Sequence, residues 1–523
     1  MNLLKPTALV LAVLGLAVLA CNPTRARLLS AEPAAGPGGG AAATGGAIDG
    51  GEVPTDGSGG GAAAATPPPL PPADQLAEAR SIVASLLNST LAFWAEHGPD
   101  WEQGGFFTTL DRWGQPILGY STSDKYLLTS ARQIVAWATL ALQHPEDERG
   151  WELAQRAFAF FNASALYDPA DGLFRYQVSR DGATPYVDNK FLYGQAFAIM
   201  GLARYGRLVG DEDAVLWAYQ VFQAVDRQRH DPMHGGYLET VEQAFPLESM
   251  GIHRSPGTSR MVNTHTHLTE ALTELSRALQ ELPAFASPEN AVAAPAMRAA
   301  VDARLAEMVR LLGLPGAPGA GLWVPFPGEL EGGHLGAEFR EDWGPLDPGS
   351  KVYKEEFISV YFLQAAARQL GWAGADLQAV RDLAIKLGRA GQEGFDPFDG
   401  GIWTDGCAGG PCLKDTCSGG APFKFWAAQV EGASGQLWMW VLTGEPLYWD
   451  RWMAVLHLVA NHLNDPEGQE FFYNVDTKSG APVCGGTIKA DRWKANYHVF
   501  RALLYWEEWL AALAAGQAPV PKV

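Results

Sequence analysis

Apolar residues recur at intervals of three and four positions from about residue 73 to residue 514. This spacing places them on one side of an α-helix and predicts helices that pack around a common core. Strong strand patterns are almost missing between these stretches, which indicates an all-α domain. We expect twelve helices, at residues 73–97, 124–143, 147–164, 189–208, 212–229, 262–282, 292–313, 352–371, 375–391, 423–442, 446–463 and 494–514.

A second pattern repeats once per pair of helices. After an odd-numbered helix, an Asp-Pro turn leads to glycine and then to an aromatic or aliphatic residue, as in DPMHGGY at 231–237. Similar turns begin near residues 99, 168 and 396, with a weaker copy at 465. Glycine permits positive φ at the tip, so each turn predicts a short β-hairpin. Six helix pairs joined in this way predict an (α/α)6 barrel with hairpins at one end.

The even-numbered helices are expected to form the inner ring, because small residues such as Gly194, Ala196, Gly432 and Gly435 let helices approach closely. The odd-numbered helices carry charged residues on one face, as an outer ring would. The inner helices then all begin at the same end, and their first polar residues converge on one mouth. These residues are Asp124, Lys125, Arg132, Lys190, Tyr193, Gln195, Asn263, His265, His267, Glu270, Tyr353, Lys354, Glu355, Glu356, Lys424, Trp426, Gln429, Glu431, Lys494, Tyr497 and His498.

A concave, aromatic and polar mouth suits a sugar, whose C–H faces stack on aromatic rings and whose hydroxyls bind polar groups. His498 lies one turn inside the last helix, where an imidazole can act as acid or base near neutral pH. Other interpretations are a core histidine for His498, a helix cap for Asn263 and a salt bridge for Arg132. His265 and His267 are two residues apart and cannot both face inward on a regular helix, which argues against a metal pair. We expect no metal and no other cofactor, because no cofactor motif is present.

The start of the chain has the pattern of an exported lipoprotein. Lys5 precedes an apolar run over residues 8–20, which is too short for a comfortable membrane span, and Cys21 follows where cleavage is expected. Residues 1–21 are therefore read as a lipoprotein signal peptide with Cys21 as the lipidated residue, the alternative being an ordinary signal peptide with an incidental cysteine. Residues 22–72 are rich in Gly, Ala and Pro and predict a flexible tether, which leaves residues 73–523 for the barrel.

The net charge and the cysteine content limit the classes of molecule that the protein is expected to bind. The formal net charge is −20 and there is no basic stripe, which argues against nucleic acid. We expect a small carbohydrate substrate, membrane contact only through a lipid anchor on Cys21, and a monomer or homodimer. We expect the protein to be exported and anchored in the bacterial cell envelope, at the outer membrane or the periplasmic face in a Gram-negative cell. Cys407, Cys412, Cys417 and Cys484 remain after Cys21, and export permits disulfides. Their spacing contains no CxxC, so zinc is the weaker interpretation, and their pairing stays open.

Seven segments carry a resemblance to a known family. They are TLDRWGQ (109–115), DKYLLTSARQIVAW (124–137), KFLYGQAFAI (190–199), NTHTHLTEAL (263–272), EDWGP (341–345), KFWAAQVEG (424–432) and WKANYHVFRALL (493–504). In this order, over about residues 75–515, the chain resembles the N-acylglucosamine 2-epimerase superfamily, which includes cellobiose 2-epimerases and mannose isomerases. The resemblance implies an (α/α)6 barrel that acts on an open-chain sugar.

The resemblance also implies roles for individual residues. Removal of the proton next to the C1 carbonyl would form a cis-enediol(ate), and return of a proton would give a 2-epimer or a ketose. His498 would be a general acid/base, and His267 would help to polarise the sugar oxygens. The substrate-binding residues implied by the resemblance or by the mouth are Arg132, Tyr193, Asn263, His265, Trp426, Gln429 and Glu431.

One motif departs from the family. Its sugar epimerases carry a second acid/base histidine in a Gly-His-x-x-Glu motif at the start of the eighth helix, where this chain has GSKVYKEEF (349–357). Alignment on Glu356 places Tyr353 at the histidine position, and a shift by one residue places Lys354 there. Glu356 becomes a candidate catalytic residue, because burial can raise the pKa of a carboxyl group.

Three functions are consistent with this departure. The first is a sugar 2-epimerase or a one-base aldose–ketose isomerase. The second is a glycoside hydrolase or polysaccharide lyase that uses Glu355 or Glu356 with Glu431 or Asp342 as a carboxylate pair. The third is a non-catalytic glycan-binding lipoprotein.

Overall fold

The structure is a computed structural model that describes residues 70–119, 121–239, 257–314, 321–326, 331–407, 410–411, 422–476 and 478–522. The signal peptide, Cys21 and nearly all of the tether lie outside these residues, as do Cys412 and Cys417. Cys407 and Cys484 are both disulfide-bonded. None of the described helices is long and apolar enough to cross a membrane. The helices all belong to one compact unit, Ala62–Val523.

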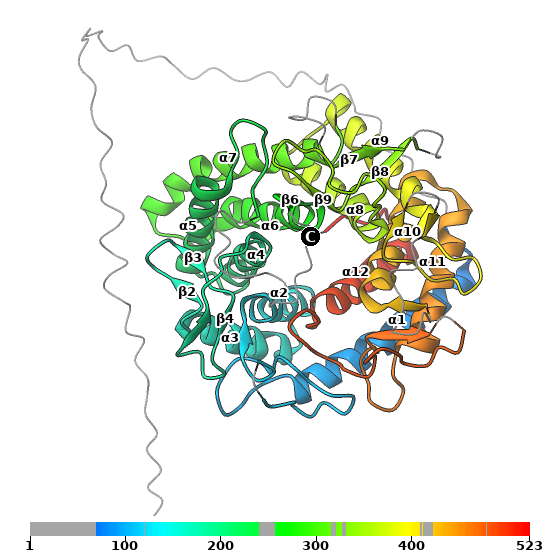
Figure 1. Ribbon diagram of the computed structural model, residues 1–523, viewed down its shortest axis with the longest axis horizontal. Helices are drawn as coiled ribbons and strands as arrows, with labels where there is room; N and C mark the ends of the chain where they lie inside the picture. Colours follow the sequence, from blue (N-terminus) through cyan, green and yellow to red (C-terminus); the bar gives the residue numbers. More distant parts are fainter. Residues whose placement is uncertain are drawn as a thin grey trace, which may run out of the picture. The chain divides into compact units, whose positions relative to one another are not determined.

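The described residues form twelve α-helices in two concentric rings (Figure 1). The inner ring consists of α2 (Leu127–Gln143), α4 (Leu192–Val209), α6 (Val262–Glu281), α8 (Tyr353–Gln369), α10 (Trp426–Thr443) and α12 (Tyr497–Ala514). The outer ring consists of α1 (Ala73–His97), α3 (Glu148–Ala163), α5 (Glu212–Arg229), α7 (Pro288–Leu311), α9 (Gly374–Gly391) and α11 (Pro446–Leu458). Each inner helix packs against its two neighbours, and α12 returns to α2. The predicted (α/α)6 barrel is confirmed.

Residue size and polarity explain which helices lie inside. Nearly every side chain of α4 is buried, whereas α3 buries a single face. A Cβ atom at Gly194 would lie 2.6 Å from the Leu127 side chain on α2, and one at Gly435 would lie 2.6 Å from Cβ of Phe357 on α8. These distances are shorter than van der Waals contact, so glycine permits the close spacing of the inner helices.

Short strands precede three inner helices, and two of these helices, α2 and α10, begin three residues later than predicted because the strand takes up the first predicted residues. Strands β1 (Lys125–Tyr126), β6 (Arg260–Met261) and β12 (Phe423–Phe425) each pair antiparallel with a strand of the next odd-to-even connection. Their partners are β4 (Gln177–Val178), β9 (Glu338–Phe339) and β13 (Asn474–Asp476). The remaining strands are β2 (Tyr167–Asp168), β3 (Leu173–Phe174), β5 (Pro185–Val187), β7 (Trp323–Pro325), β8 (Gly333–Leu335), β10 (Gly406–Cys407) and β11 (Gly410–Pro411).

The hairpins lie in the odd-to-even connections, as predicted. Strands β2 and β3 form one of them. Single antiparallel bridges close four others, at Pro99↔Phe106, His230↔Tyr237, Phe395↔Ile402 and Asn464↔Phe471. A sixth hairpin, β7–β8, follows α7. A hairpin is predicted in every odd-to-even connection, but this one lacks the Asp-Pro signal, so the sequence does not locate it.

The hairpin aspartates bind cations that precede the inner helices. Two residues before α2, Lys125 Nζ lies 2.9 Å from Asp100 Oδ2. Lys424, two residues before α10, is likewise 3.0 Å from Asp396 Oδ2. The same arrangement occurs at Lys190 with Asp168 and at Arg260 with Asp231. These cations pair with the hairpins, which corrects the expectation that Lys125, Lys190 and Lys424 line the mouth.

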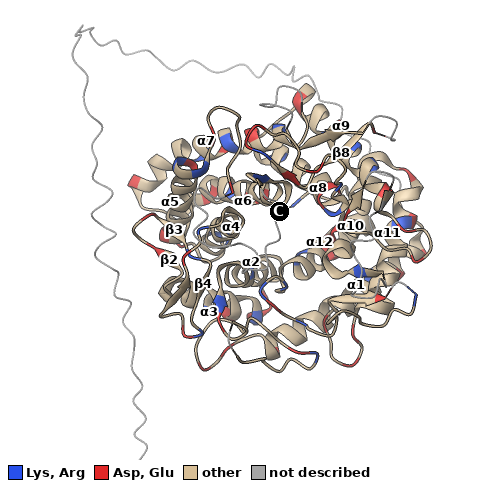
Figure 2. Ribbon diagram, viewed as in Figure 1, with Lys and Arg blue, Asp and Glu red and all other residues tan. Residues whose placement is uncertain are grey.

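Charged residues are concentrated in the outer helices and the connections, and the inner ring carries few of them (Figure 2). Burial of an unpaired charge is costly, so the charges that do lie inside the ring need partners. The partners of these inner charges define the candidate site.

Candidate active site

The first turns of the inner helices present two sets of side chains in different directions. Successive residues of an α-helix are rotated by about 100°, so residues two apart point in nearly opposite directions. The fourth residue of four inner helices binds the backbone of a hairpin. These contacts are Gln195 to Phe174, His265 to Tyr237, Glu356 to Leu335 and Gln429 to Ile402. The second residue of these helices therefore faces the mouth, and these residues are Tyr193, Asn263, Lys354 and Ala427.

His498, the second residue of α12, is 4% exposed. Its Nδ1 atom donates a hydrogen bond of 2.5 Å to Oε1 of Glu431, because the carboxylate can only accept. The lone pair is thus on Nε2, which accepts from Nη2 of Arg132 over 3.3 Å. Burial lowers the pKa of His498 well below 6.5, and the charges of Arg132 and Lys354 lower it further. The imidazole is therefore neutral near pH 7 and has the form of a base.

Glu431, the sixth residue of α10, is fully buried among donors. Tyr361 donates to its Oε2 over 2.8 Å, and Arg501 and His498 both donate to its Oε1. Both oxygens of Glu431 thus already accept hydrogen bonds from protein side chains. We therefore correct its expected role: Glu431 fixes the tautomer and orientation of His498.

His267 forms a second histidine–glutamate pair. Its Nδ1 donates to Oε2 of Glu270 over 2.9 Å, and its buried Nε2 has no hydrogen-bond partner among the described residues. Burial lowers the pKa of His267 to about 4. Burial by itself would raise the pKa of Glu270, but the charge of Arg501 and the bond from His267 lower it to about 2. Arg501 bonds the carboxylates behind both histidines, whose ring centroids are 5.9 Å apart.

Arg132 reaches this pair from α2. Its Nη1 donates to the Trp493 carbonyl over 2.5 Å, and its Nη2 donates to the Tyr193 hydroxyl over 2.7 Å. The guanidinium also lies over the Phe197 ring, with Cζ 4.4 Å from the centroid. A fixed positive charge thus lies beside Nε2 of His498. The structure brings Arg132, Tyr193, His267 and His498 together, and their roles toward a sugar remain predictions.

Trp426 and Asn263 complete the set near the mouth. The Trp426 ring centroid lies 5.4 Å from that of His498, with the planes at 72°. Oδ1 of Asn263 is buried and has no hydrogen-bond partner among the described residues. An unpartnered buried acceptor suits a ligand hydroxyl, since such atoms are otherwise paired.

Glu356 does not face the mouth. Its Oε1 accepts from Nδ1 of His334 over 3.0 Å and from the Leu335 backbone N–H over 2.9 Å, so it anchors the β7–β8 hairpin. The hydrogen bond to Glu356 raises the pKa of His334, although burial of the imidazole opposes this. We therefore correct the assignment of Glu356 as catalytic. The sequence could not show this, because His334 belongs to the hairpin whose position carries no Asp-Pro signal.

Two expected substrate-binding residues are also hairpin anchors. His265 Nε2 accepts from the Tyr237 N–H over 3.1 Å, and its Nδ1 donates to the Met261 carbonyl over 2.8 Å. Gln429 bonds both backbone groups of Ile402, at 2.8 and 2.7 Å. With their polar groups satisfied inside the protein, neither is placed to bind a sugar, and both assignments are corrected.

On α8 the mouth receives Lys354. Its Nζ lies 2.9 Å from Oε1 of Glu355, and the Lys354 side chain is 13% exposed. Tyr353 instead points outward, where its hydroxyl donates to Glu393 over 2.9 Å. Of the two residues that the sequence left open for the missing histidine, Lys354 is therefore the one in the site.

The carboxylate pair of a glycoside hydrolase or lyase is not assembled. Glu431 and Glu356 are occupied as described, and Asp342 is exposed in a turn where it accepts from the Gly344 N–H. Oε2 of Glu355 and Oε2 of Glu356 are both buried without a hydrogen-bond partner among the described residues, but Glu356 is turned toward the β7–β8 hairpin. A pair needs two available carboxyl groups on either side of the bond to be cleaved.

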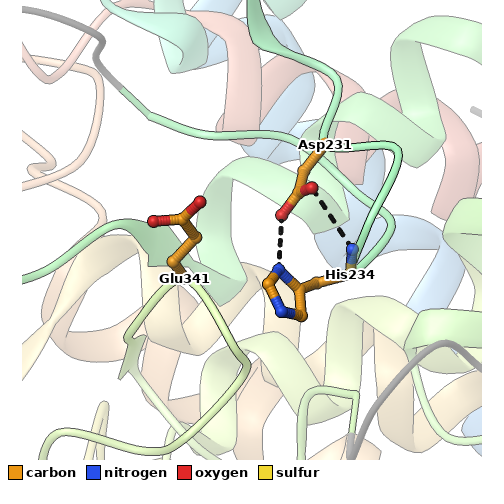
Figure 3. Close-up of side chains that lie close together, drawn as sticks. All are labelled: Asp231, His234 and Glu341. Atoms are coloured by element: carbon orange, nitrogen blue, oxygen red, sulfur yellow. Dashed lines mark hydrogen bonds and ion pairs between the residues drawn. The ribbon is translucent and has the colours of Figure 1, made fainter.

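A cluster outside the mouth resembles a metal site in composition. Asp231, His234 and Glu341 lie close together (Figure 3). However, Oδ2 of Asp231 accepts from His234 and from Arg260, and Oδ1 accepts from the backbone N–H groups of Met233 and His234. The Arg260 guanidinium already supplies a positive charge to Asp231, so we interpret the cluster as a group that holds the hairpin in place.

Comparison with known proteins agrees with this architecture. The family profile described as N-acylglucosamine 2-epimerase (GlcNAc 2-epimerase) matches residues 105–302. A cellobiose 2-epimerase from Bacteroides fragilis is 24% identical over 416 residues, covering 79% of this chain and 94% of that protein. The N-acylglucosamine 2-epimerase of Bos taurus is 26% identical over 441 residues, covering 84% and 92%.

Solved structures show the same similarity to sugar 2-epimerases. A cellobiose 2-epimerase from Spirochaeta thermophila matches with a TM-score of 0.67 and 26% identity, over 84% of this chain and 99% of that one. A GH76 α-mannanase from Bacteroides thetaiotaomicron has a TM-score of 0.52 at 7% identity, and that likeness shows the fold alone. In sequence and in fold the chain is therefore similar to the N-acylglucosamine 2-epimerase superfamily of carbohydrate epimerases and isomerases.

Proposed function

We propose that the protein is a sugar 2-epimerase or aldose–ketose isomerase in which His498 removes the proton from C2 of an open-chain aldose. The observation that carries this proposal is the hydrogen bond from His498 Nδ1 to Glu431, which leaves the Nε2 lone pair beside Arg132. A neutral imidazole held in one tautomer is suited to accept a proton.

The neighbouring groups suit the intermediate of this reaction. As the C2 proton leaves, negative charge develops on the C1 oxygen of the enediolate. The Arg132 guanidinium lies within reach of the same Nε2 atom and can stabilise that charge. His267 donates its Nδ1 proton to Glu270, so its free Nε2 can accept a hydrogen bond from a sugar hydroxyl.

Hydrogen exchange tests the proposal directly. The full chain is incubated in D2O with mannose, glucose, cellobiose, mannobiose and N-acetylmannosamine, and the sugars are read by NMR. We expect deuterium at C2 of an aldose or at C1 of a ketose with at least one of them, and none with His498→Ala. The absence of deuterium from every sugar with the wild-type chain would refute the proposal.

We also propose that Cys21 carries a lipid that anchors the protein to the cell envelope. The support is the apolar run over residues 8–20 directly before Cys21. Expression in a bacterium with labelled palmitate should give a labelled protein in the membrane fraction, and Cys21→Ser should abolish the label. An unlabelled wild-type protein would contradict the anchor.

A further inference from the structure

Lys354 occupies the same place on α8 that His498 occupies on α12. Each is the second residue of an inner helix, and their fellow second residues include Tyr193 on α4 and Asn263 on α6. All four side chains therefore start from the first turns of their helices. His498 contacts Arg132 and Glu431, and its ring centroid lies 5.9 Å from that of His267. On α8, Lys354 and Glu355 are the first-turn residues whose side chains bind no hairpin group among the described residues, and they pair with each other.

Lys354 differs from the other lysines near the inner helix starts. Lys125, Lys190 and Lys424 precede their helices and bind hairpin aspartates. Lys354 lies inside its helix, and Glu355 is its one ion-pair partner among the described residues. Its ammonium group is therefore turned toward the mouth rather than used to hold a hairpin.

The charge of Lys354 is felt by both histidines of the site. It lowers the pKa of His498 and of His267, although burial is the larger cause in each case. Burial would lower the pKa of Lys354 itself, but the neighbouring carboxylate of Glu355 outweighs it and raises that pKa. Lys354 is consequently a proton donor near neutral pH, whereas His498 is a proton acceptor.

We propose that Lys354 is the general acid of the reaction and that His498 is its only base, so that the enzyme interconverts an aldose and a ketose rather than two C2 epimers. This inference rests on the proposed function and specifies its product. Epimerisation needs a proton delivered to the opposite face of C2, and the family's epimerases have a second histidine on the eighth helix. At the mouth of this barrel, the eighth helix offers the ammonium group of Lys354 instead of an imidazole.

The protons balance with these two groups alone. His498 takes the proton from C2, the C1=C2 double bond forms, and O1 receives a proton from the Lys354 ammonium. In the second half, the O2–H proton passes to the neutral Lys354 amine, the C2 carbonyl forms, and C1 receives a proton from His498 after that proton has exchanged with solvent. Both side chains return to their starting state, and the aldose has become a ketose.

Product analysis tests the inference separately from the proposed function. The full chain is given mannose, glucose or cellobiose in D2O, and the products are separated and examined by NMR. We expect a ketose as the product, with exchange confined to C1 of the ketose and C2 of the starting aldose. A C2 epimer as the main product would overturn the role of Lys354 while leaving the proposed function intact. If none of the five sugars named for the proposed function gave a ketose, a C2 epimer or deuterium exchange, both would be overturned.

Variants of Lys354 supply a second test. Lys354→Met should lower kcat by about 10²–10⁴-fold, the usual effect of losing a positioned acid. Lys354→Arg keeps the charge but holds its proton too tightly to exchange it, so kcat should fall while KM changes little. Lys354→Met should also move the acid limb of the kcat/KM profile to higher pH, because His498 loses a positive neighbour. Wild-type kcat and an unmoved acid limb in Lys354→Met would refute the inference.

Lys424→Met is a matched control. Lys424 is also buried at the same end of the barrel, but it binds Asp396 of a hairpin. This variant should lower the melting temperature without altering the product or the acid limb. Comparison with Lys354→Met at equal folded fraction separates a loss of chemistry from a loss of stability. If both variants lost kcat equally at equal folded fraction, Lys354 would have no special role.

Discussion

Nδ1 of His498 and Oε1 of Glu431 lie 2.5 Å apart, although the two residues belong to different helices, α12 and α10. Glu431 is itself held by Tyr361 and Arg501. The carboxylate therefore sets both the direction of the imidazole and the nitrogen that carries its proton. This hydrogen bond between two helices cannot be read from the sequence. It determines that Nε2 of His498 is the base of the proposed reaction.

Glu431→Gln should impair the chemical step more than binding. The amide cannot hold the Nδ1 proton of His498 as a carboxylate does, so Nε2 loses its preference as the acceptor. We expect kcat to fall by about 10²–10⁴-fold with a smaller change in KM, measured by steady-state kinetics. Glu274→Gln is the control, because Glu274 is equally buried but binds Arg204 and Arg207 elsewhere on the inner ring. Unchanged kcat in Glu431→Gln would show that the pair does not orient the base.

The pH profile should have its acid limb below the ordinary pKa of histidine. Burial and the charges of Arg132 and Arg501 lower the pKa of His498 well below 6.5. The base must be neutral to act, and a lowered pKa keeps it neutral to lower pH. We therefore expect kcat/KM to stay level on acidification to about pH 6.5 and to decline only below it. An acid limb above pH 6.5 would contradict the burial and charge arrangement around His498.

Glu356→Gln should affect stability rather than chemistry. Glu356 is fully buried and holds His334 and the backbone of Leu335, so the substitution weakens the β7–β8 hairpin. Breaking a buried charge pair costs about 3–5 kcal/mol. Thermal unfolding should show a lower Tm, while kcat per folded molecule stays near the wild-type value. A loss of kcat at unchanged Tm would restore Glu356 as a catalytic candidate.

Removal of divalent ions should leave the enzyme unchanged. In the Asp231, His234 and Glu341 cluster, both oxygens of Asp231 already accept hydrogen bonds and Arg260 supplies the charge. Dialysis against EDTA is therefore expected to alter neither Tm nor the exchange rate. Activity that disappeared with EDTA and returned with a divalent ion would show that the cluster binds metal.

Many elements of the fold could be predicted locally. The apolar period located twelve helices, and the Asp-Pro and Gly signals located five of the hairpins. The late starts of α2 and α10 have a tertiary cause: the extended residues before them hydrogen-bond to a strand of the next connection, which local sequence does not reveal. The β7–β8 hairpin lacked the signal, and without it the partner of Glu356 could not be foreseen.

The sequence by itself determined the barrel, the end at which polar residues gather, and His498 as the leading candidate base. These follow from helical period and chain order, which are local properties. Only the tertiary structure decided the direction of each side chain, because residues two positions apart on one helix point to opposite sides. It assigned His265, Glu356 and Gln429 to the hairpins, placed Glu431 behind His498, and put Lys354 at the mouth. A rotation of about 200° about one helix axis separates an anchor from a site residue, and packing against neighbouring helices sets that rotation.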